Sequence, residues 1–213
     1  MYIIWPISHC YSETPKSSIS WGRGFKWKIF LIIMNMRYLF LVFCLSGLWI
    51  HAQSINWMTL GEALEAQREN PKKIIVDVYT DWCGPCKLMD KKTFQNRDVA
   101  TYISKYYYAV KFNAEGQETI NYYGNTFTNP DYVPNRNGRN STHQFTKFLG
   151  VKGYPTVVFI SETGDLITPL VGYQNPQQIE LYLKMIKQGD YMIFSKPEDF
   201  ENYRKNFRPR FRG

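Results

Sequence analysis

A buried-strand pattern runs directly into a pair of closely spaced cysteines. The segment KIIVDVYT (residues 73–80) is rich in β-branched residues, which is typical of a central strand covered on both faces. Cys83 and Cys86 follow it, separated only by Gly84 and Pro85. Proline is favoured in the first turn of a helix, where its missing N–H group costs no hydrogen bond. The sequence therefore predicts a strand that ends at about residue 80 and a helix that begins at the cysteines.

This placement gives the two cysteines unequal chemical roles. Only a thiolate attacks a disulfide, and the N-terminus of a helix stabilises negative charge. We therefore expect Cys83 to be the exposed, attacking thiolate. Cys86 lies one helical turn later on the same face, so we expect it to be more covered and to act as the resolving thiol. The pair is thus predicted to be a working dithiol.

One acidic residue interrupts the predicted strand. Asp77 lies six residues before Cys83, among β-branched neighbours. Burial there raises the pKa of a carboxyl group, which could then accept the proton of Cys86 directly or through a water molecule. The alternative is an Asp77 that faces outward or lies at an edge of the sheet.

Further helices and strands alternate along the chain. Helices are predicted after a capping box at 59–62, after Asn96 or Asp98, after Ser141 and after Asn175-Pro176. Strands are predicted at 107–113 and 156–160, with a hairpin partner at 166–173 that Pro169 marks as a sheet edge. This order predicts an α/β fold with a central mixed sheet flanked by helices.

Several segments, in order, resemble the thioredoxin family. VDVYTDWCGPCK (76–87) resembles its active-site segment, and VKFN (110–113) resembles its central strand, whose lysine is Lys111 here. LGVKGYPTVVFI (149–160) resembles the cis-proline segment, and VGY (171–173) resembles the glycine stretch beside the substrate groove. The resemblance covers about residues 55–187. It implies a thioredoxin fold and a protein-disulfide oxidoreductase activity.

The resemblance also implies roles for residues around the dithiol. It places the cis-proline at Pro155, opposite the dithiol, and Tyr154 would offer its backbone groups to a substrate strand. Gly172 would help to form the substrate groove, and Lys111 would neighbour Asp77. The supporting residues of the active-site segment are Trp82, Gly84 and Pro85. Tyr154 is bulkier than the residue usual at its position, which leaves the redox potential and the substrate choice open.

Two segments go beyond the family pattern. Residues 115–140, rich in Asn, Tyr, Gly and Pro, form an insertion before the cis-proline segment of a domain at 53–190. Loops of this length are functional or disordered; we expect a flexible surface loop, with a groove-shaping role as the alternative. Residues 191–213 form a basic, aromatic C-terminal extension, expected to be a solvated and partly frayed tail. A phosphate-binding patch is the alternative for that tail.

The N-terminal region is predicted to be a targeting segment that is not part of the folded domain. Arg37, an apolar stretch at 38–50 and the small residue Ala52 have the layout of a secretory signal peptide, which we assign to 34–52. Residues 1–33 are interpreted as a misassigned start or a disordered leader. A longer membrane anchor is the alternative. We therefore expect the mature chain to be periplasmic or secreted.

Charge and cysteine content exclude other functions. Of the 26 basic and 18 acidic residues, five and one lie in 1–52, and the remaining excess is too mild for a nucleic-acid binder. Beyond residue 52 the only cysteines are Cys83 and Cys86, and the only histidine is His143, so a zinc site lacks ligands. We expect no metal and no cofactor. A disulfide that closes so short a loop stabilises little, which disfavours a purely structural clip.

These patterns predict a thiol:disulfide oxidoreductase that reduces or isomerises disulfides of exported proteins through a mixed disulfide. The Gly-Pro dipeptide resembles that of reducing thioredoxins, and an exported reductase needs a membrane electron donor. A disulfide-forming oxidant and a non-catalytic thioredoxin-like binding module are the alternatives.

Overall fold

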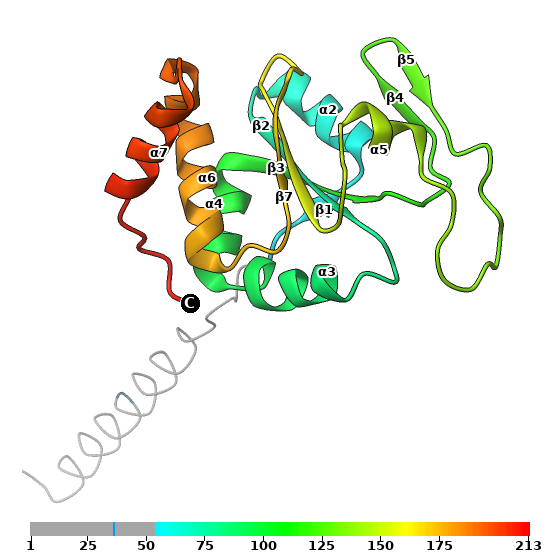
Figure 1. The fold of residues 1–213 in the computed structure, drawn as a ribbon, viewed down its shortest axis with the longest axis horizontal. Coiled ribbons are helices and arrows are strands. Elements are labelled where there is room, and N and C mark those ends of the chain that lie inside the picture. Colours follow the sequence, from blue (N-terminus) through cyan, green and yellow to red (C-terminus); the bar gives the residue numbers. More distant parts are fainter. Residues whose placement is uncertain (1–35, 37–53) are drawn as a thin grey trace, which may run out of the picture. The chain divides into compact units, whose positions relative to one another are not determined.

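The part of the chain described by the computed structural model is Met36 and residues 54–213 (Figure 1). The predicted signal peptide and leader, Met36 apart, lie outside the described residues. Within the described part, no helix has the length and the apolar character needed to cross a membrane.

A five-stranded mixed sheet forms the centre of the fold, as predicted. Its strand order is β1 (Trp57–Met58), β3 (Tyr107–Asn113), β2 (Lys73–Tyr79), β6 (Thr156–Ile160) and β7 (Leu166–Val171). Strands β1 and β2 run parallel to β3, whereas β6 is antiparallel to β2 and to β7. The central position of β2 explains its continuous apolar pattern, and β7, which carries Pro169, is confirmed as an edge strand.

Helices cover both faces of the sheet, as Figure 1 shows. They are α2 (Leu60–Glu69), α3 (Gly84–Met89), α4 (Arg97–Tyr106), α5 (Gln144–Phe148) and α6 (Pro176–Gln188), with a π-helical turn at Asp90–Phe94. A 3-10 turn at Asp190–Ile193 leads to α7 (Pro197–Asn206), which lies on the outer side of α6 (Figure 1). Ile75 of β2 packs with α3, α4 and α6, whereas Ile74 and Val76 pack with α2 and α5. Because side chains alternate along a strand, Asp77 shares the face of Ile75 and therefore lies on the side of α3.

The helix starts follow the predicted capping residues, with one exception. Thr59 and Asn175 form capping boxes, and Asn96 caps α4. The prediction that Ser141 caps the short helix is wrong. His143 caps α5, its Nδ1 accepting the Phe145 N–H at 3.0 Å, because the Ser141 hydroxyl instead donates to Asn129.

The insertion is folded, so the prediction of a flexible loop at 115–140 is wrong. It contains a hairpin of β4 (Ile120–Tyr122) and β5 (Asn125–Phe127), visible beside α5 in Figure 1. Ile120 and Tyr122 are buried in the core that α2 and α5 share, and the Tyr122 hydroxyl donates to the Gly164 carbonyl. Aromatic residues that looked like loop composition therefore supply core packing.

The C-terminal extension is docked, so the prediction of a solvated and frayed tail is also wrong. Beyond α7, the backbone N–H groups of Arg210 and Phe211 both donate to the buried carboxylate of Glu180 in α6, each at 2.7 Å. The Arg212 guanidinium pairs with Asp98 in α4 at 2.8 Å. These partners fix the last residues of the chain against the α4–α6 side of the domain.

Candidate active site

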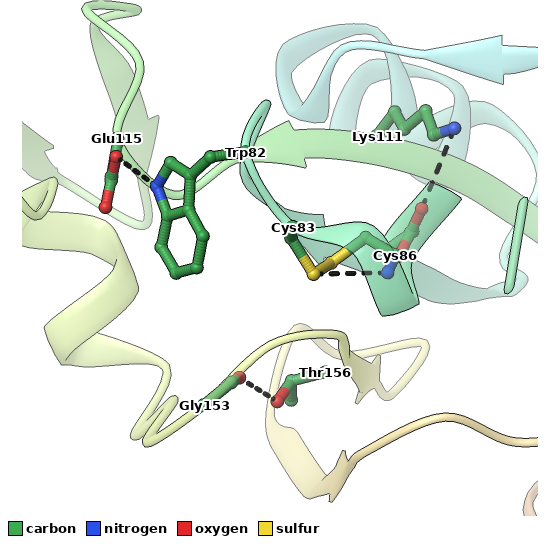
Figure 2. The surroundings of a disulfide bond; sticks show 8 residues. Trp82, Cys83, Cys86, Lys111, Glu115, Gly153 and Thr156 are labelled. Carbon is green, nitrogen blue, oxygen red and sulfur yellow. Dashed lines mark hydrogen bonds and ion pairs between the residues drawn. A yellow bond between two sulfur atoms is a disulfide. The ribbon is translucent and has the colours of Figure 1, made fainter. Parts of the chain in front are cut away.

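Cys83 and Cys86 form a disulfide at the start of α3, with Cα atoms 5.3 Å apart (Figure 2). Cys83 is the N-cap residue, and its Sγ accepts the backbone N–H of Cys86 at 3.1 Å. Pro85 lies in the first helical turn, as predicted. The sequence folds in this way because Cys83 stays extended while Gly84 and Pro85 begin the helix. A backbone donor is therefore directed at the Cys83 sulfur.

The two cysteines do not differ in exposure as predicted. Cys83 is 2 % exposed and Cys86 is 6 % exposed, so the expectation of an exposed Cys83 and a covered Cys86 is wrong. Figure 2 shows the reason: Cys83 lies beside Trp82 and opposite the turn between Gly153 and Thr156. The asymmetry that remains is electrostatic, because the helix amide points at Cys83 whereas Cys86 lines a cavity with acidic groups.

Asp77 is buried beneath the cysteine helix, as predicted. It is 3 % exposed and lines, together with Cys86, a cavity of about 180 Å³. Burial raises the pKa of Asp77 to about 7, with Lys111 opposing this shift and Asp90 adding to it. The carboxyl group can therefore exchange a proton near neutral pH.

Lys111 lies between two carboxylates, and one of them was missed by the sequence analysis. Its Nζ is 3.8 Å from Asp77 Oδ2 and 2.5 Å from Asp90 Oδ1. Lys111 neighbours Asp77 because the two residues are register partners on β3 and β2. A signal for Asp90 exists in the sequence, since it follows Cys86 by four residues and so shares its helix face.

A buried hydroxyl also lines this cavity. The Thr80 Oγ1 atom is buried and has no hydrogen-bond partner among the described residues. The backbone carbonyl oxygen of Thr80 accepts the Cys83 N–H at 3.1 Å, which ties the end of β2 to the dithiol. The Thr80 hydroxyl and the Asp77 carboxyl are among the polar groups that line the cavity next to Cys86, and a water needs at least two polar partners.

The segment predicted to contain the cis-proline does contain it. The Tyr154–Pro155 peptide bond is cis, and the segment faces the dithiol (Figure 2). Gly172 donates its N–H to the Pro155 carbonyl at 2.8 Å and has a φ of 94°, a conformation that favours glycine. Pro155 and Gly172 are thus brought together at the same end of the sheet as Cys83.

Trp82 joins the dithiol to the insertion. Its indole Nε1 donates to Glu115 at 2.9 Å, and its ring meets the Tyr154 ring edge-on with centroids 6.0 Å apart. The guanidinium of Arg139 lies 4.4 Å from the centre of the Trp82 ring. Glu115 and Arg139 were missed by the sequence analysis, because a position within a long irregular segment gives no signal of what it contacts.

A comparison with protein-family models identifies the domain family of the chain. A model described as a thioredoxin-like domain matches residues 60–187. The chain belongs to the thioredoxin-like family. The cysteine pair at disulfide distance lies within the matched region of this thioredoxin-like domain.

Individual relatives agree with this assignment. Over 139 residues the chain is 25% identical to the thiol:disulfide interchange protein DsbD of Pectobacterium atrosepticum, a match that covers 63% of the chain and 20% of DsbD. The chain thus spans about one fifth of that relative's length. A thioredoxin-fold protein from Helicobacter pylori superimposes with a TM-score of 0.50 at 20% identity, covering 64% of this chain and 82% of the other. This second likeness supports the fold alone.

Metal binding finds no support in the described residues. Across Met36 and 54–213, no three side chains of His, Cys, Asp or Glu gather as ligands would. Asp77 and Asp90, two of the acidic groups that line the cavity with Cys86, have Lys111 between them.

Proposed function

We propose that the thioredoxin-like domain is a thiol:disulfide oxidoreductase that reduces or isomerises disulfides of exported proteins. The observation that carries the proposal is the unequal surroundings of the two sulfurs. The Cys86 N–H donates to Cys83 Sγ, whereas Cys86 shares a cavity with Asp77, whose pKa is raised to about 7. This arrangement supports an attacking role for Cys83 and a resolving role for Cys86.

In the first step, the Cys83 thiolate of the reduced protein attacks one sulfur of a substrate disulfide. A bond forms between Cys83 and that sulfur, the substrate S–S bond breaks, and the second substrate sulfur leaves as a thiolate that takes up a proton. The helix amide supports this step because hydrogen bonding to a thiolate lowers its pKa.

In the second step, Cys86 gives its proton to Asp77 and attacks Cys83 Sγ. The Cys83–Cys86 disulfide forms, the mixed disulfide breaks, and the first substrate sulfur leaves as a thiolate. Two electrons thereby pass from the protein dithiol to the substrate. Asp77 suits the role of base because a pKa of about 7 matches neutral conditions. The cavity of about 180 Å³ can hold a bridging water, which fills about 30 Å³ in the liquid.

Substrate binding is assigned to the cis-proline segment. The segment between Gly153 and Thr156, which contains the cis-proline, faces the dithiol (Figure 2). Gly172 donates to the Pro155 carbonyl, and we propose that the backbone of Tyr154 remains for pairing with a substrate strand. The predicted signal peptide and the similarity to DsbD support an exported location. The Cys83–Cys86 disulfide of an exported reductase must be reduced again after each cycle, and we propose a membrane protein as the electron donor.

Insulin reduction in the presence of dithiothreitol tests the activity. We expect the wild-type chain to accelerate insulin precipitation and the Cys83→Ser variant to be inactive. The Cys86→Ser variant should accumulate mixed disulfides with its substrates, which non-reducing electrophoresis and mass spectrometry detect. A non-catalytic binding module would show no acceleration and no trapped species.

A redox titration of the Cys83–Cys86 pair tests the direction. We expect a potential near that of reducing thioredoxins, about −270 mV. A value near that of the strong oxidants, about −120 mV, would instead indicate a disulfide-forming oxidant.

A further inference from the structure

The insertion places a cation at the rim of the dithiol. Trp82 lies beside Cys83 (Figure 2), and the Arg139 guanidinium is 4.4 Å from the Trp82 ring centre. Tyr154 meets the same ring from the cis-proline segment. The indole therefore connects Arg139 to the segment that faces the disulfide. A peptide that binds against Trp82 and Tyr154 would therefore meet this charge.

The two ends of the insertion are held together at residues 115–116, 129 and 140–141, which we call its neck, and this neck holds Arg139 in place. The adjacent Asn140 donates its backbone N–H to Glu115 at 2.8 Å, and its side chain bonds both the N–H and the carbonyl of Val133. Asn129 donates to the carbonyls of Gly116 and Ser141, both at 2.9 Å. Since the backbone on one side of Arg139 is fixed, its position costs little conformational entropy when a substrate binds.

The charged groups around the rim favour an anionic partner. Glu115 is already engaged by Trp82 and Asn140, and Asp81 accepts from Asn113. Among the described residues, by contrast, Arg139 forms no ion pair, and neither do the exposed cations Lys87 and Lys152 of the cysteine helix and the cis-proline segment. The donors of these three cations are therefore available to a substrate, whereas Glu115 and Asp81 each already accept hydrogen bonds from neutral groups through one carboxylate oxygen.

We propose that Arg139 is a specificity-determining residue that favours disulfide substrates with carboxylate side chains next to the disulfide. A guanidinium stacked on an aromatic ring keeps its edge N–H donors free for a carboxylate. The inference rests on the proposed oxidoreductase function and adds the chemical class of its substrates.

Two peptide substrates with one intramolecular disulfide test the proposal. They share one sequence, apart from the residues flanking the cysteines, which are Asp and Glu in one peptide and Lys in the other. We expect the wild-type chain to reduce the acidic peptide with a kcat/KM roughly fivefold higher, within the range of electrostatic steering. This preference should fade in about 0.5 M salt, where charges are screened.

The variants separate Arg139 from its surroundings. Arg139→Ala should lose the preference by slowing reduction of the acidic peptide alone, and Arg139→Glu should reverse it. Arg139→Lys should retain part of it, because the charge remains but the planar stacking is lost. Arg136→Ala is the matched control, since Arg136 is an exposed cation of the same insertion and the cation–π contact with Trp82 is made by Arg139, and it should keep the preference.

The possible outcomes test separately the preference for acidic substrates, the role of Arg139 and the oxidoreductase function. Equal rates for both peptides with the wild-type chain would overturn the inference and leave the oxidoreductase function intact. A preference that survives Arg139→Ala would overturn the role of Arg139. If the wild-type chain reduces neither peptide, the proposed function fails and the inference fails with it.

Discussion

Two carboxylates are buried in this thioredoxin-like domain, and their surroundings differ sharply. Glu180 is completely buried and accepts two backbone N–H groups at 2.7 Å and the Lys184 ammonium at 2.5 Å. Asp77 is 3 % exposed, and no described residue donates a hydrogen bond to it. Lys111, at 3.8 Å, is its cationic neighbour.

The contrast shows that burial alone does not determine what a carboxylate does. Glu180 has the donors that stabilise a buried charge, so it can fix the C-terminal extension to α6. Asp77 lacks them, so its pKa rises to about 7 and its proton remains exchangeable. One buried acid serves stability, and the other retains a reactive proton at the expense of stability.

The largest expected effect comes from Asp77→Asn in the oxidised protein. The folded pKa of about 7 lies above the unfolded value of 3.8, so the folded state binds more protons between these pH values. Wild-type stability should therefore fall as the pH rises from about 4 to about 7 and then level off. At pH 8 the variant should be more stable than the wild-type chain by at most about 4 kcal/mol. The fall in the free energy of unfolding between about pH 4 and pH 7 that Asp77 causes should be absent in the variant.

Urea unfolding at a series of pH values measures this effect. Asp77→Asn should also slow the resolution of mixed disulfides, because the base is lost, while the attack by Cys83 proceeds. A variant that is less stable than the wild-type chain at pH 8 would show that burial of the charged Asp77 carboxylate does not destabilise the fold as expected.

Glu180→Ala should have the opposite sign. It leaves the N–H groups of Arg210 and Phe211 without their acceptor, and buried donors without partners are costly. We expect a loss of about 3 kcal/mol in the free energy of unfolding, with no change in the redox potential. Glu201→Ala, which removes an exposed partner of Arg204, is the control and should leave the urea midpoint unchanged. If Glu180→Ala and Glu201→Ala lowered the urea midpoint equally, Glu180 would have no special role in stability and would not differ from an exposed carboxylate.

Asp90→Asn should sharpen the description of Asp77. The Asp90 charge raises the pKa of Asp77, and Asp90 also competes for Lys111. Its removal should therefore lower the pKa of Asp77 by up to about one unit. A carbon-13 NMR titration of the Asp77 carboxyl group measures this shift. Asp81→Asn is the control and should leave the titration unchanged; a rise in the pKa after Asp90→Asn would contradict the proposed coupling.

The smallest effect is expected at Asp98, the half-buried anchor of the extension. Hydrogen bonds from Arg212 lower the pKa of Asp98 to about 2. The contribution of this pair is therefore present above about pH 4 and is lost as the pH falls towards 2, and salt weakens it. Asp98→Asn should speed hydrogen exchange at the Arg212 amide, whereas the Arg210 amide on Glu180 should stay protected. Loss of protection at both amides would mean that Asp98, and not Glu180, holds the extension.

The sequence predicted those features that depend on local pattern. Periodicity and capping gave the order of strands and helices around the sheet, and the β-branched run located buried Asp77. Spacing placed Cys83 and Pro85 at a helix start, and the family resemblance placed the cis-proline at Pro155. All of these depend on neighbours in the chain or on motifs with a fixed structure.

The features that were mispredicted depend on contacts between distant segments. Glu180 and Arg210 are thirty residues apart, so the composition of the tail alone suggested fraying. Tyr122 and Phe145 meet across the insertion, and an Asn- and Gly-rich composition concealed that packing. The covering of Cys83 likewise comes from the cis-proline segment, far along the chain. Local patterns carry no information about such pairings.

The closed neck of the insertion gives the molecule a place to accept new sequence. Asn129 donates to the Ser141 carbonyl and Asn140 donates to the Val133 carbonyl, which holds the base of residues 130–139, and residues 134–138 at the tip are exposed. Lengthening a loop whose ends are already held costs little, because loop entropy grows slowly with length. A recognition peptide grafted at 134–138 would therefore be displayed on the insertion that contacts Trp82, next to the cysteine pair, which makes this scaffold suitable for bringing a chosen protein to the dithiol.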